Sequence, residues 1–153
     1  MTPPDAPVGE AAHFRSLEGL YRSAPVNDLF PSRLEITGAG ASRIRFDVTP
    51  AVFHAAGAAH GTIYFKMLDD AAFYAANSLV SDRFLLTTAF NVHLTRPMRE
   101  GPVVAEGRWL SGRRRVFVAE ARLVDASGEE VARGTGTFAR SRIALATLPG
   151  YVG

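Results

Sequence analysis

Three ionisable side chains interrupt an otherwise apolar stretch over residues 62–79, and their types could support acid–base chemistry. They are Lys66, Asp69 and Asp70. A buried carboxylate is costly unless it is paired, and adjacent carboxylates on a helix point about 100° apart. Lys66 stands three and four residues before the two acids, so it could pair with either. We assign the ion pair to Asp70, which leaves Asp69 as the candidate general base or nucleophile.

The start of the same stretch supplies a second candidate element. Gly61 and Thr62 follow His60 at the predicted beginning of the helix. The first backbone N–H groups of a helix have no partner within it and lie at the positive end of the helix dipole. They could therefore receive a carbonyl oxygen that becomes an oxyanion, and Gly61 would let a ligand approach closely. A simple tight turn explains Gly61 equally well.

Two histidines and two adjacent threonines complete the set of candidate site residues. His54 and His60 flank a loop of small residues, but no third ligand is placed, so we predict no metal. A histidine in such a loop more often fixes the shape of the backbone. Thr87 and Thr88 lie near the start of the strand after the helix, where a hydroxyl could face a catalytic water. Ordinary β-propensity is the alternative explanation for both residues.

Arginine dominates the basic residues, because Lys66 is the only lysine among 17 Lys and Arg residues. The cluster Arg113, Arg114 and Arg115 is either a solvated turn or a contact for an anionic group, since arginine forks suit phosphate. The chain has no basic stripe with interleaved aromatics, so we expect no nucleic-acid partner. No apolar run approaches the roughly 20 residues that span a bilayer, so we expect no membrane partner.

Composition restricts the remaining classes of protein. The 153 residues suffice for one domain, and 47% apolar with 21% charged residues is ordinary for a globular chain. There is no cysteine, which excludes disulfides, zinc–thiolate sites and thiol nucleophiles within the chain. The first residues lack the basic and apolar regions of a signal peptide. We therefore expect a cytoplasmic protein.

Periodicity predicts the elements that must position these residues. A short amphipathic helix is expected over 10–22, and period-two alternation near 34–48 predicts a strand pair interrupted at 38–40. The stretch 62–79 is apolar nearly all round, which predicts a buried helix. We expect a meander of antiparallel strands at about 84–95, 102–110, 115–125 and 130–140. The class is then α+β, with the sheet curled around the helix.

The domain organisation follows from these elements. Residues 1–32 are interpreted as a Pro-rich leader with a short helix, and residues 33–140 as the main domain. The tail over 141–153 is apolar but irregular, and we expect it to lie on a neighbouring subunit.

The pattern resembles the hotdog-fold thioesterases, in particular the PaaI-like branch that hydrolyses acyl-coenzyme A (CoA) esters. That branch shows an Asn-x-x-Gly-x-x-His-Gly-Gly loop with an aspartate nine residues after the histidine. The similarity covers roughly residues 33–140. The segments that carry it are His54-Ala-Ala-Gly57-Ala-Ala-His60-Gly61-Thr62 with Asp69, then Thr87 to Arg96-Pro97, Ser111-Gly-Arg-Arg-Arg115, and Gly134-Thr-Gly-Thr-Phe138. His54 stands where the branch has asparagine, and Thr62 replaces its second glycine.

The resemblance implies a hotdog fold, a long helix wrapped by an antiparallel sheet, in a homodimer or homotetramer. It implies that Asp69 of one subunit faces Gly61 and His60 of the other and acts on a thioester carbonyl. The Gly61 amide would polarise that carbonyl, and Thr87 would orient the water. Residues Arg113 to Arg115 would meet the nucleotide end of CoA. No cofactor is expected beyond the CoA that the substrate carries.

Two other functions remain open at this point. A non-catalytic module that binds acyl-CoA could use the same fold, although binding alone does not need a buried carboxylate. A hotdog dehydratase or hydratase would pair a histidine with an acid at another spacing, which does not occur around Asp69. We predict that Asp69 is required for turnover and that Asp70 serves stability or assembly.

Overall fold

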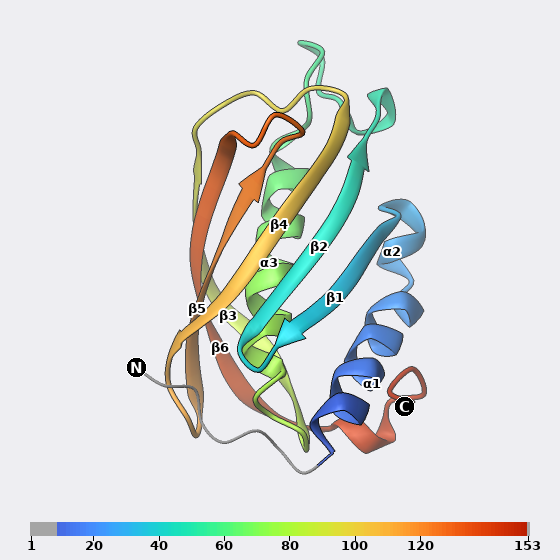
Figure 1. Cartoon of the computed structure of the whole chain (residues 1–153), viewed down its shortest axis with the longest axis vertical. Helices are drawn as coiled ribbons and strands as arrows, with labels where there is room; N and C mark the ends of the chain where they lie inside the picture. The colour runs from blue at the N-terminus through green and yellow to red at the C-terminus, as the bar shows by residue number, and fades with distance from the viewer. Residues whose placement is uncertain (1–8, 153) are drawn as a thin grey trace.

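The structure is a computed structural model that describes residues 9–152, in which one long helix lies against a curved six-stranded sheet (Figure 1). The long helix and the α+β class confirm the sequence prediction. The elements, in chain order, are α1 (Glu10–Ser23), α2 (Val26–Leu29), β1 (Ser32–Gly38), β2 (Ala41–Val48), the 3₁₀ turn η1 (Pro50–Val52), α3 (Gly61–Asn77), β3 (Arg83–Leu94), β4 (Gly101–Ser111), β5 (Val116–Val124), β6 (Glu130–Ala144) and the 3₁₀ turn η2 (Leu145–Thr147).

The strands are antiparallel and lie in the order β1-β2-β4-β5-β6-β3. The prediction of a four-strand meander is therefore wrong for β3, which pairs with β6 and not with β4. After β3 the chain crosses past β6 and β5 before it begins β4. Along this connection Thr95 and Arg96 donate their backbone N–H groups to the carbonyl of Val131. Strand β3 is left at an edge of the sheet, beside α3.

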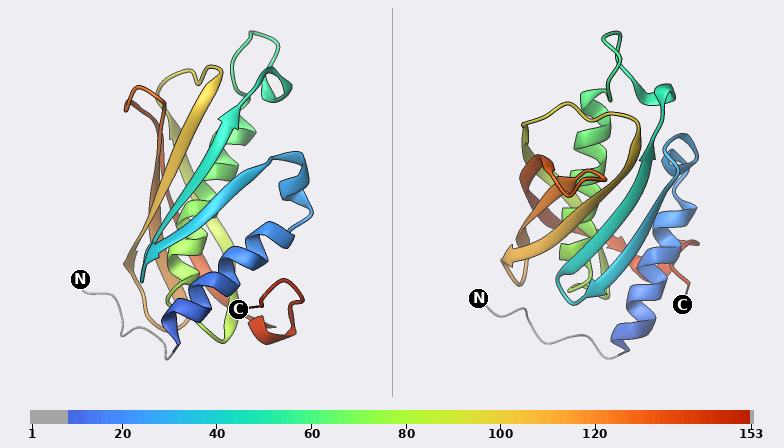
Figure 2. Two further views of the ribbon diagram at one scale, coloured as in Figure 1. Left: turned by 45° about the vertical axis from the view of Figure 1, so that its right-hand side comes forward. Right: turned by 45° about the horizontal axis from the view of Figure 1, so that its top comes forward.

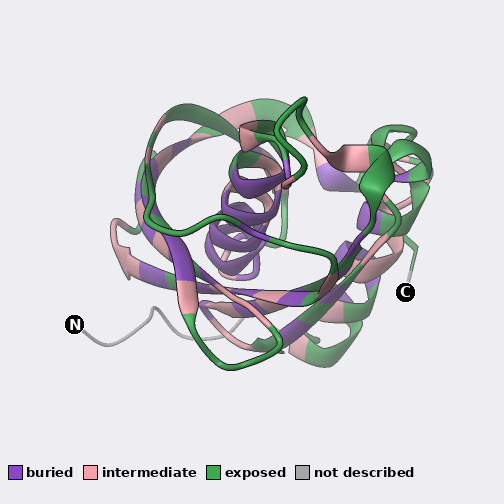
Figure 3. Ribbon diagram, turned by 90° about the horizontal axis from the view of Figure 1, so that it is seen from above, coloured by how far each residue is buried: buried purple, intermediate pink, exposed green. Residues whose placement is uncertain are grey.

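Helix α3 is enclosed by the curved sheet, as Figures 2 and 3 show from other sides. Its residues after Gly61 contain no glycine or proline, and its alanines allow close packing. At Gly107 of β4, a Cβ would lie 2.0 Å from the carbonyl oxygen of Ala71. The helix therefore rests directly on the backbone of the sheet. The carbonyl of Ala71 also accepts a hydrogen bond from Ser42 Oγ at 2.6 Å.

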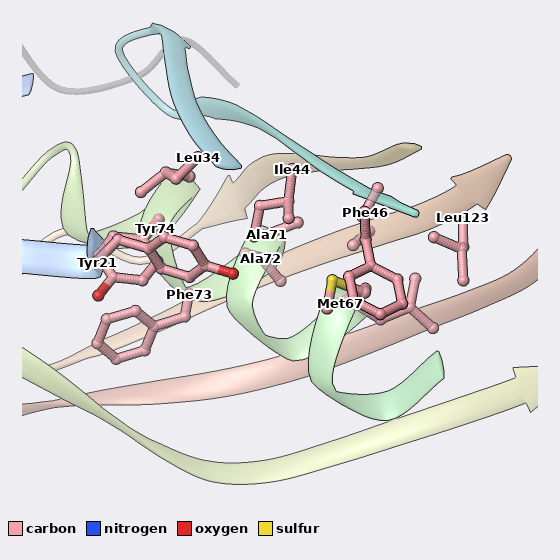
Figure 4. Packing of buried hydrophobic residues seen from close by; sticks show 14 of the residues in the cluster. Tyr21, Leu34, Ile44, Phe46, Met67, Ala71, Ala72, Phe73, Tyr74 and Leu123 are labelled. Carbon is pink, nitrogen blue, oxygen red and sulfur yellow. The ribbon is translucent and has the colours of Figure 1, made fainter. Parts of the chain in front are cut away.

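The core lies between α3 and the concave face of the sheet (Figure 4). Its labelled members come from α1, α3, the first two strands and β5, and they include Tyr21, Met67, Ala71, Ala72, Ile44, Phe46 and Leu123. Alternate residues of β2, β4 and β5 are buried, as expected for strands with one face on the core. The other face of these strands carries charged pairs such as Arg122 with Glu106.

The C-terminal tail packs against its own chain, so the expectation that it lies on a neighbouring subunit is wrong. Strand β6 continues to Ala144, and Leu145 is fully buried with its N–H donated to the carbonyl of Asp82. Tyr151 hydrogen-bonds through its hydroxyl to Nδ1 of His13 in α1 at 2.6 Å. Burial lowers the pKa of His13, whose Nε2 donates to the carbonyl of Asn77 at the end of α3. Residues 1–8, the first part of the predicted leader segment 1–32, lie outside the described residues.

Candidate active site

Asp69 lies on the side of α3 that faces β3, and its carboxylate is mostly buried. Thr87 of β3 donates its hydroxyl to Oδ1 of Asp69 at 2.9 Å. Burial raises the pKa of Asp69 to about 6, although the Thr87 hydrogen bond and Lys66 act in the opposite direction. The neighbouring charge of Asp70 raises this pKa further. A carboxylate with a pKa this close to neutrality can accept a proton and later release it.

An irregularity in β3 brings two of its side chains to the face that lies against α3. The register between β3 and β6 shifts between Thr87 and Ala89. In a regular strand, residues three apart point to opposite faces, yet Thr87 contacts Asp69 and Phe90 stacks edge to face with Phe65 of the same helix. The extra residue in the bulge brings Thr87 and Phe90 to one face. No residue pattern predicted this bulge.

Asp70 has a different environment from Asp69, and the predicted ion pair with Lys66 is confirmed. The Lys66 Nζ lies 2.6 Å from Asp70 Oδ2 and 2.7 Å from Oδ1 of Asn27 in α2. It also lies 5.3 Å from the centre of the Tyr21 ring in α1. Burial raises the pKa of Asp70, and Lys66 opposes that shift. This polar cluster of Tyr21, Asn27, Lys66 and Asp70 ties the N-terminal helices to α3.

The start of α3 leaves one backbone donor available. His60 caps the helix, because its Nδ1 accepts the Thr62 N–H at 3.1 Å and lies 3.0 Å from the Thr62 hydroxyl. The Ile63 N–H bonds to the His60 carbonyl. Within residues 9–152, no acceptor is found for the Gly61 N–H. The predicted free amide at the start of the helix is thus present, and His60 and Thr62 hold the turn that presents it.

His54 fixes the loop before α3, in keeping with its expected backbone role. Its Nδ1 accepts the Ala56 N–H at 3.0 Å, and its own N–H bonds to the Ala58 carbonyl. A pocket of about 310 Å³ opens between this loop, Gly61 and the end of β3. Leu94 lines it, lies next to Gly61, and leaves 52% of its surface exposed. Sequence reasoning missed Leu94, since an exposed leucine at a strand end gives no signal of its own.

Gly61 and Asp69 do not meet within one chain. They are eight residues apart in a continuous helix, and a rise of 1.5 Å per residue separates them by about 12 Å. A thioester carbonyl cannot contact both groups of the same chain at hydrogen-bond distance.

The turn that contains Arg113, Arg114 and Arg115, here called the arginine turn, lies at the opposite end of the molecule from Gly61. It connects β4 to β5 near the end of α3, whereas Gly61 begins the helix at the other end (Figure 1). Arg114 and Arg115 are exposed, and the Arg115 carbonyl accepts the Arg140 N–H. Arg140 itself pairs with Asp82. The turn therefore adds positive charge at the end of β6 but does not approach the Gly61 amide of its own chain.

Other features of the described residues bear on which site is present. No group of three His, Asp or Glu side chains comes together over residues 9–152. No helix in that range is long and apolar enough to cross a membrane.

Sequence comparison decides the family. A sequence model of the thioesterase superfamily matches residues 56–132, which is half of the chain. The chain belongs to the thioesterase superfamily. The matched range contains most of the small-residue loop, all of α3 with Asp69, and Thr87.

Solved structures share the hotdog arrangement of this superfamily member. The PaaI protein from the phenylacetic acid degradation operon of Escherichia coli superposes with a TM-score of 0.81, covering 88% of this chain and 97% of that chain at 18% identity. A thioesterase of Haemophilus influenzae gives a TM-score of 0.75 at 15% identity, covering 84% and 90% of the two chains. These likenesses establish the predicted hotdog fold.

One curated relative also matches. A protein of Saccharolobus solfataricus named as an esterase is 28% identical over 99 residues, or 65% of this chain. The match covers 66% of that relative, slightly less than two thirds of its length.

Proposed function

We propose that this thioesterase superfamily member hydrolyses acyl-CoA thioesters to a carboxylic acid and free CoA. The observation that carries the proposal is Asp69, a mostly buried carboxylate whose raised pKa and hydrogen bond from Thr87 suit an acid–base residue. The Lys66–Asp70 pair accounts for the other acid of the helix. Among residues 9–152, Thr87 is the side chain that hydrogen-bonds Asp69, and a purely structural role for Asp69 would not need its charge.

The reaction uses one proton relay through Asp69. The carboxylate accepts a proton from a water whose oxygen attacks the thioester carbon, and the carbonyl oxygen becomes an oxyanion. The free Gly61 N–H donates a hydrogen bond to that oxyanion. When the intermediate collapses, the C–S bond breaks and Asp69 returns its proton to the CoA sulfur. Direct attack by Asp69 would instead form an anhydride that water hydrolyses, with the same residue required.

We infer that the site forms between two copies of the chain. The separation of about 12 Å between Gly61 and Asp69 prevents one chain from supplying both groups. Strand β3 has one edge without a neighbouring strand, and within β3 only Leu85 is buried. Leu94 at the end of this strand and Phe65 of the adjacent α3 are exposed by 52% and 45%. Pairing two β3 edges antiparallel about a two-fold axis would bring Gly61 of one copy toward Asp69 of the other.

The arginine turn fits the nucleotide end of CoA in that arrangement. Arg113, Arg114 and Arg115 lie at the end of the molecule away from their own Gly61, so antiparallel pairing brings them to the end that holds the partner's Gly61. Arginine forks bind phosphate groups well, and the diphosphate and 3′-phosphate of CoA are such groups.

The direct test is the release of CoA from a panel of acyl-CoAs, followed with a thiol reagent. The chain has no cysteine, so it contributes no background thiol. Turnover of one or more panel members, abolished in Asp69→Ala, would support both the reaction and the site. A folded protein that binds acyl-CoA without turnover would instead favour the binding-module alternative.

The pH dependence of turnover is expected to depend on Thr87. A general base works when it is ionised, so kcat/KM should fall as the pH drops through about 6, the pKa of Asp69. Thr87→Val removes the hydroxyl that stabilises the carboxylate, so the acid limb should move to higher pH. The measurement is a pH profile of kcat/KM for both proteins. Thr88→Val is the matched control, because Thr88 bonds to Thr137 instead. If the acid limb of kcat/KM lies at the same pH in the wild type and in Thr87→Val, the assignment of Asp69 as the general base is contradicted.

The Gly61 amide can be removed with little change to the helix. Proline is tolerated at the first helical position, and His60 already has the extended ψ of 148° that a following proline requires. We expect Gly61→Pro to lower kcat by roughly 10²–10³-fold, the loss typical of one oxyanion donor. Gly61→Ala is the control, because it adds a carbon but keeps the N–H.

Mixed dimers test whether the site is shared. Refolding Asp69→Asn together with Gly61→Pro should restore about a quarter of wild-type activity, because half of the dimers then contain one intact site of two. No recovery, in mixtures shown to exchange subunits, would place both groups in one chain and overturn the shared site.

A further inference from the structure

Two phenylalanine rings lie beside the candidate carboxylate on the surface between α3 and β3. Phe65 precedes Asp69 by one turn of the helix, and Phe90 follows Thr87 along the strand. Their ring centres are 5.5 Å apart with the planes at 71°. Phe65 remains 45% exposed, so the pair forms part of the surface that a ligand at Asp69 would meet.

Phe90 leaves no space between itself and the sheet. A Cβ at Gly134 or at Gly136 would lie 2.4 Å from atoms of the Phe90 ring, so the ring lies directly on the backbone of β6. Phe138 is fully buried and packs against Phe90 with ring centres 6.4 Å apart. A chain of methylene groups cannot pass behind a ring packed in this way.

The direction of the acyl group follows from the order of residues along α3 and β3. From the end of α3 back toward its start, Asp69 with Thr87 comes first, Phe65 with Phe90 next, and Gly61 with Leu94 last. In the shared site, CoA is too large for the interior and extends outward toward the arginine turn. The acyl group on the other side of the carbonyl must then extend inward, toward Phe65 and Phe90 and the two-fold axis.

We propose that Phe65 and Phe90 form the end wall of the acyl pocket and restrict the enzyme to short acyl groups. This inference rests on the proposed hydrolysis of acyl-CoA. The wall stands one helical turn from Asp69, about 5.4 Å, a distance that roughly four carbon atoms fill. The wall also requires glycine at positions 134 and 136, because a side chain at either position would displace Phe90.

The test compares kcat/KM for acetyl-, butyryl-, hexanoyl- and decanoyl-CoA in three proteins. The wild type should prefer the short esters. Phe90→Ala should raise the ratio of decanoyl-CoA to butyryl-CoA roughly 10-fold or more, because the longer chain gains a pocket for its added methylenes. Phe84→Ala removes the same ring from the same strand, where it packs on Phe73 at 5.0 Å, and should leave the ratio unchanged.

Two further variants separate a folding defect, a failure of the proposed wall and a failure of the proposed hydrolysis. If Phe90→Ala fails to fold, Phe90→Leu removes the flat ring with a smaller loss of volume, and its ratio should shift in the same direction. A folded Phe90 variant with the wild-type ratio, or a wild type that prefers decanoyl-CoA, would overturn the wall while hydrolysis lost in Asp69→Asn still supports the reaction. No hydrolysis of any ester by the wild type would overturn both.

Discussion

Asp69→Asn is expected to lower kcat for acyl-CoA hydrolysis by roughly 10²–10⁴-fold, the contribution typical of a positioned general base. The amide has nearly the same shape and can still accept the Thr87 hydroxyl bond, so only the proton transfer is lost. Steady-state CoA release at pH 8, where the wild-type carboxylate is ionised, measures the effect.

Stability should not suffer in that variant. The pKa of Asp69 is raised on folding from 3.8 to about 6, so the protonated carboxyl favours the folded state. That contribution is lost as the pH rises through about 6, and at neutral pH the charge costs stability. We therefore expect Asp69→Asn to have a Tm at pH 7 equal to or above that of the wild type.

The adjacent acid supplies the matched control. Asp70→Asn makes the same chemical change one residue later, on the face of α3 that packs against α1 and α2. It should retain most of kcat but lose stability, because Lys66 is left largely buried without its anion. Substantial activity in Asp69→Asn, or a folded but inactive Asp70→Asn, would reverse the roles of the two carboxylates.

Lys66→Met should give the largest loss of stability, about 2–4 kcal/mol at pH 7. It leaves Asp70 mostly buried without its cation, and breaking one side of a buried ion pair is costly. It also removes the donor to Asn27 and the cation beside Tyr21. Urea unfolding at pH 7 gives the free energy.

The dependence of this loss on pH identifies its cause. Without Lys66, the raised pKa of Asp70 rises further, so the cost of its charge is present above the unfolded pKa of about 4. The difference between wild type and Lys66→Met should therefore shrink as the pH falls from 7 to 4. The double variant Lys66→Met/Asp70→Asn should recover part of the loss. A deficit independent of pH, with no recovery, would mean that lost packing by the lysine stem is responsible.

Much of the fold could be predicted from local pattern. The helix at Gly61–Asn77 follows from the stretch 62–79, which lacks glycine and proline and is apolar nearly all round. Strand periodicity located β4, β5 and β6. Sequence did not predict which strands pair, because β3 has the same alternation whether its neighbour is β4 or β6. The fate of the tail depended on Leu145 and Tyr151, whose partners lie far away in the chain.

The candidate site was predictable where one helix defines it. The spacing of Lys66, Asp69 and Asp70 was enough to separate the paired acid from the other one. Thr87 could be selected only through the family resemblance, since a threonine in a strand is unremarkable by itself. Phe90 could not be placed at all, because its orientation depends on a bulge and on two glycines of another strand.

The contact between Gly107 and the carbonyl of Ala71 fixes how deeply α3 lies in the sheet. Main chain rests on main chain there, so the height of the helix does not depend on the size of the side chains around it. Volume-conserving exchanges among core residues such as Met67 and Leu68 should consequently leave Asp69 where it is. A single methyl group at position 107, on the opposite side of the helix, would lift the whole helix and move the carboxylate with it. The position of the Asp69 carboxylate is thus set by Gly107, a residue that contributes no atom to the site.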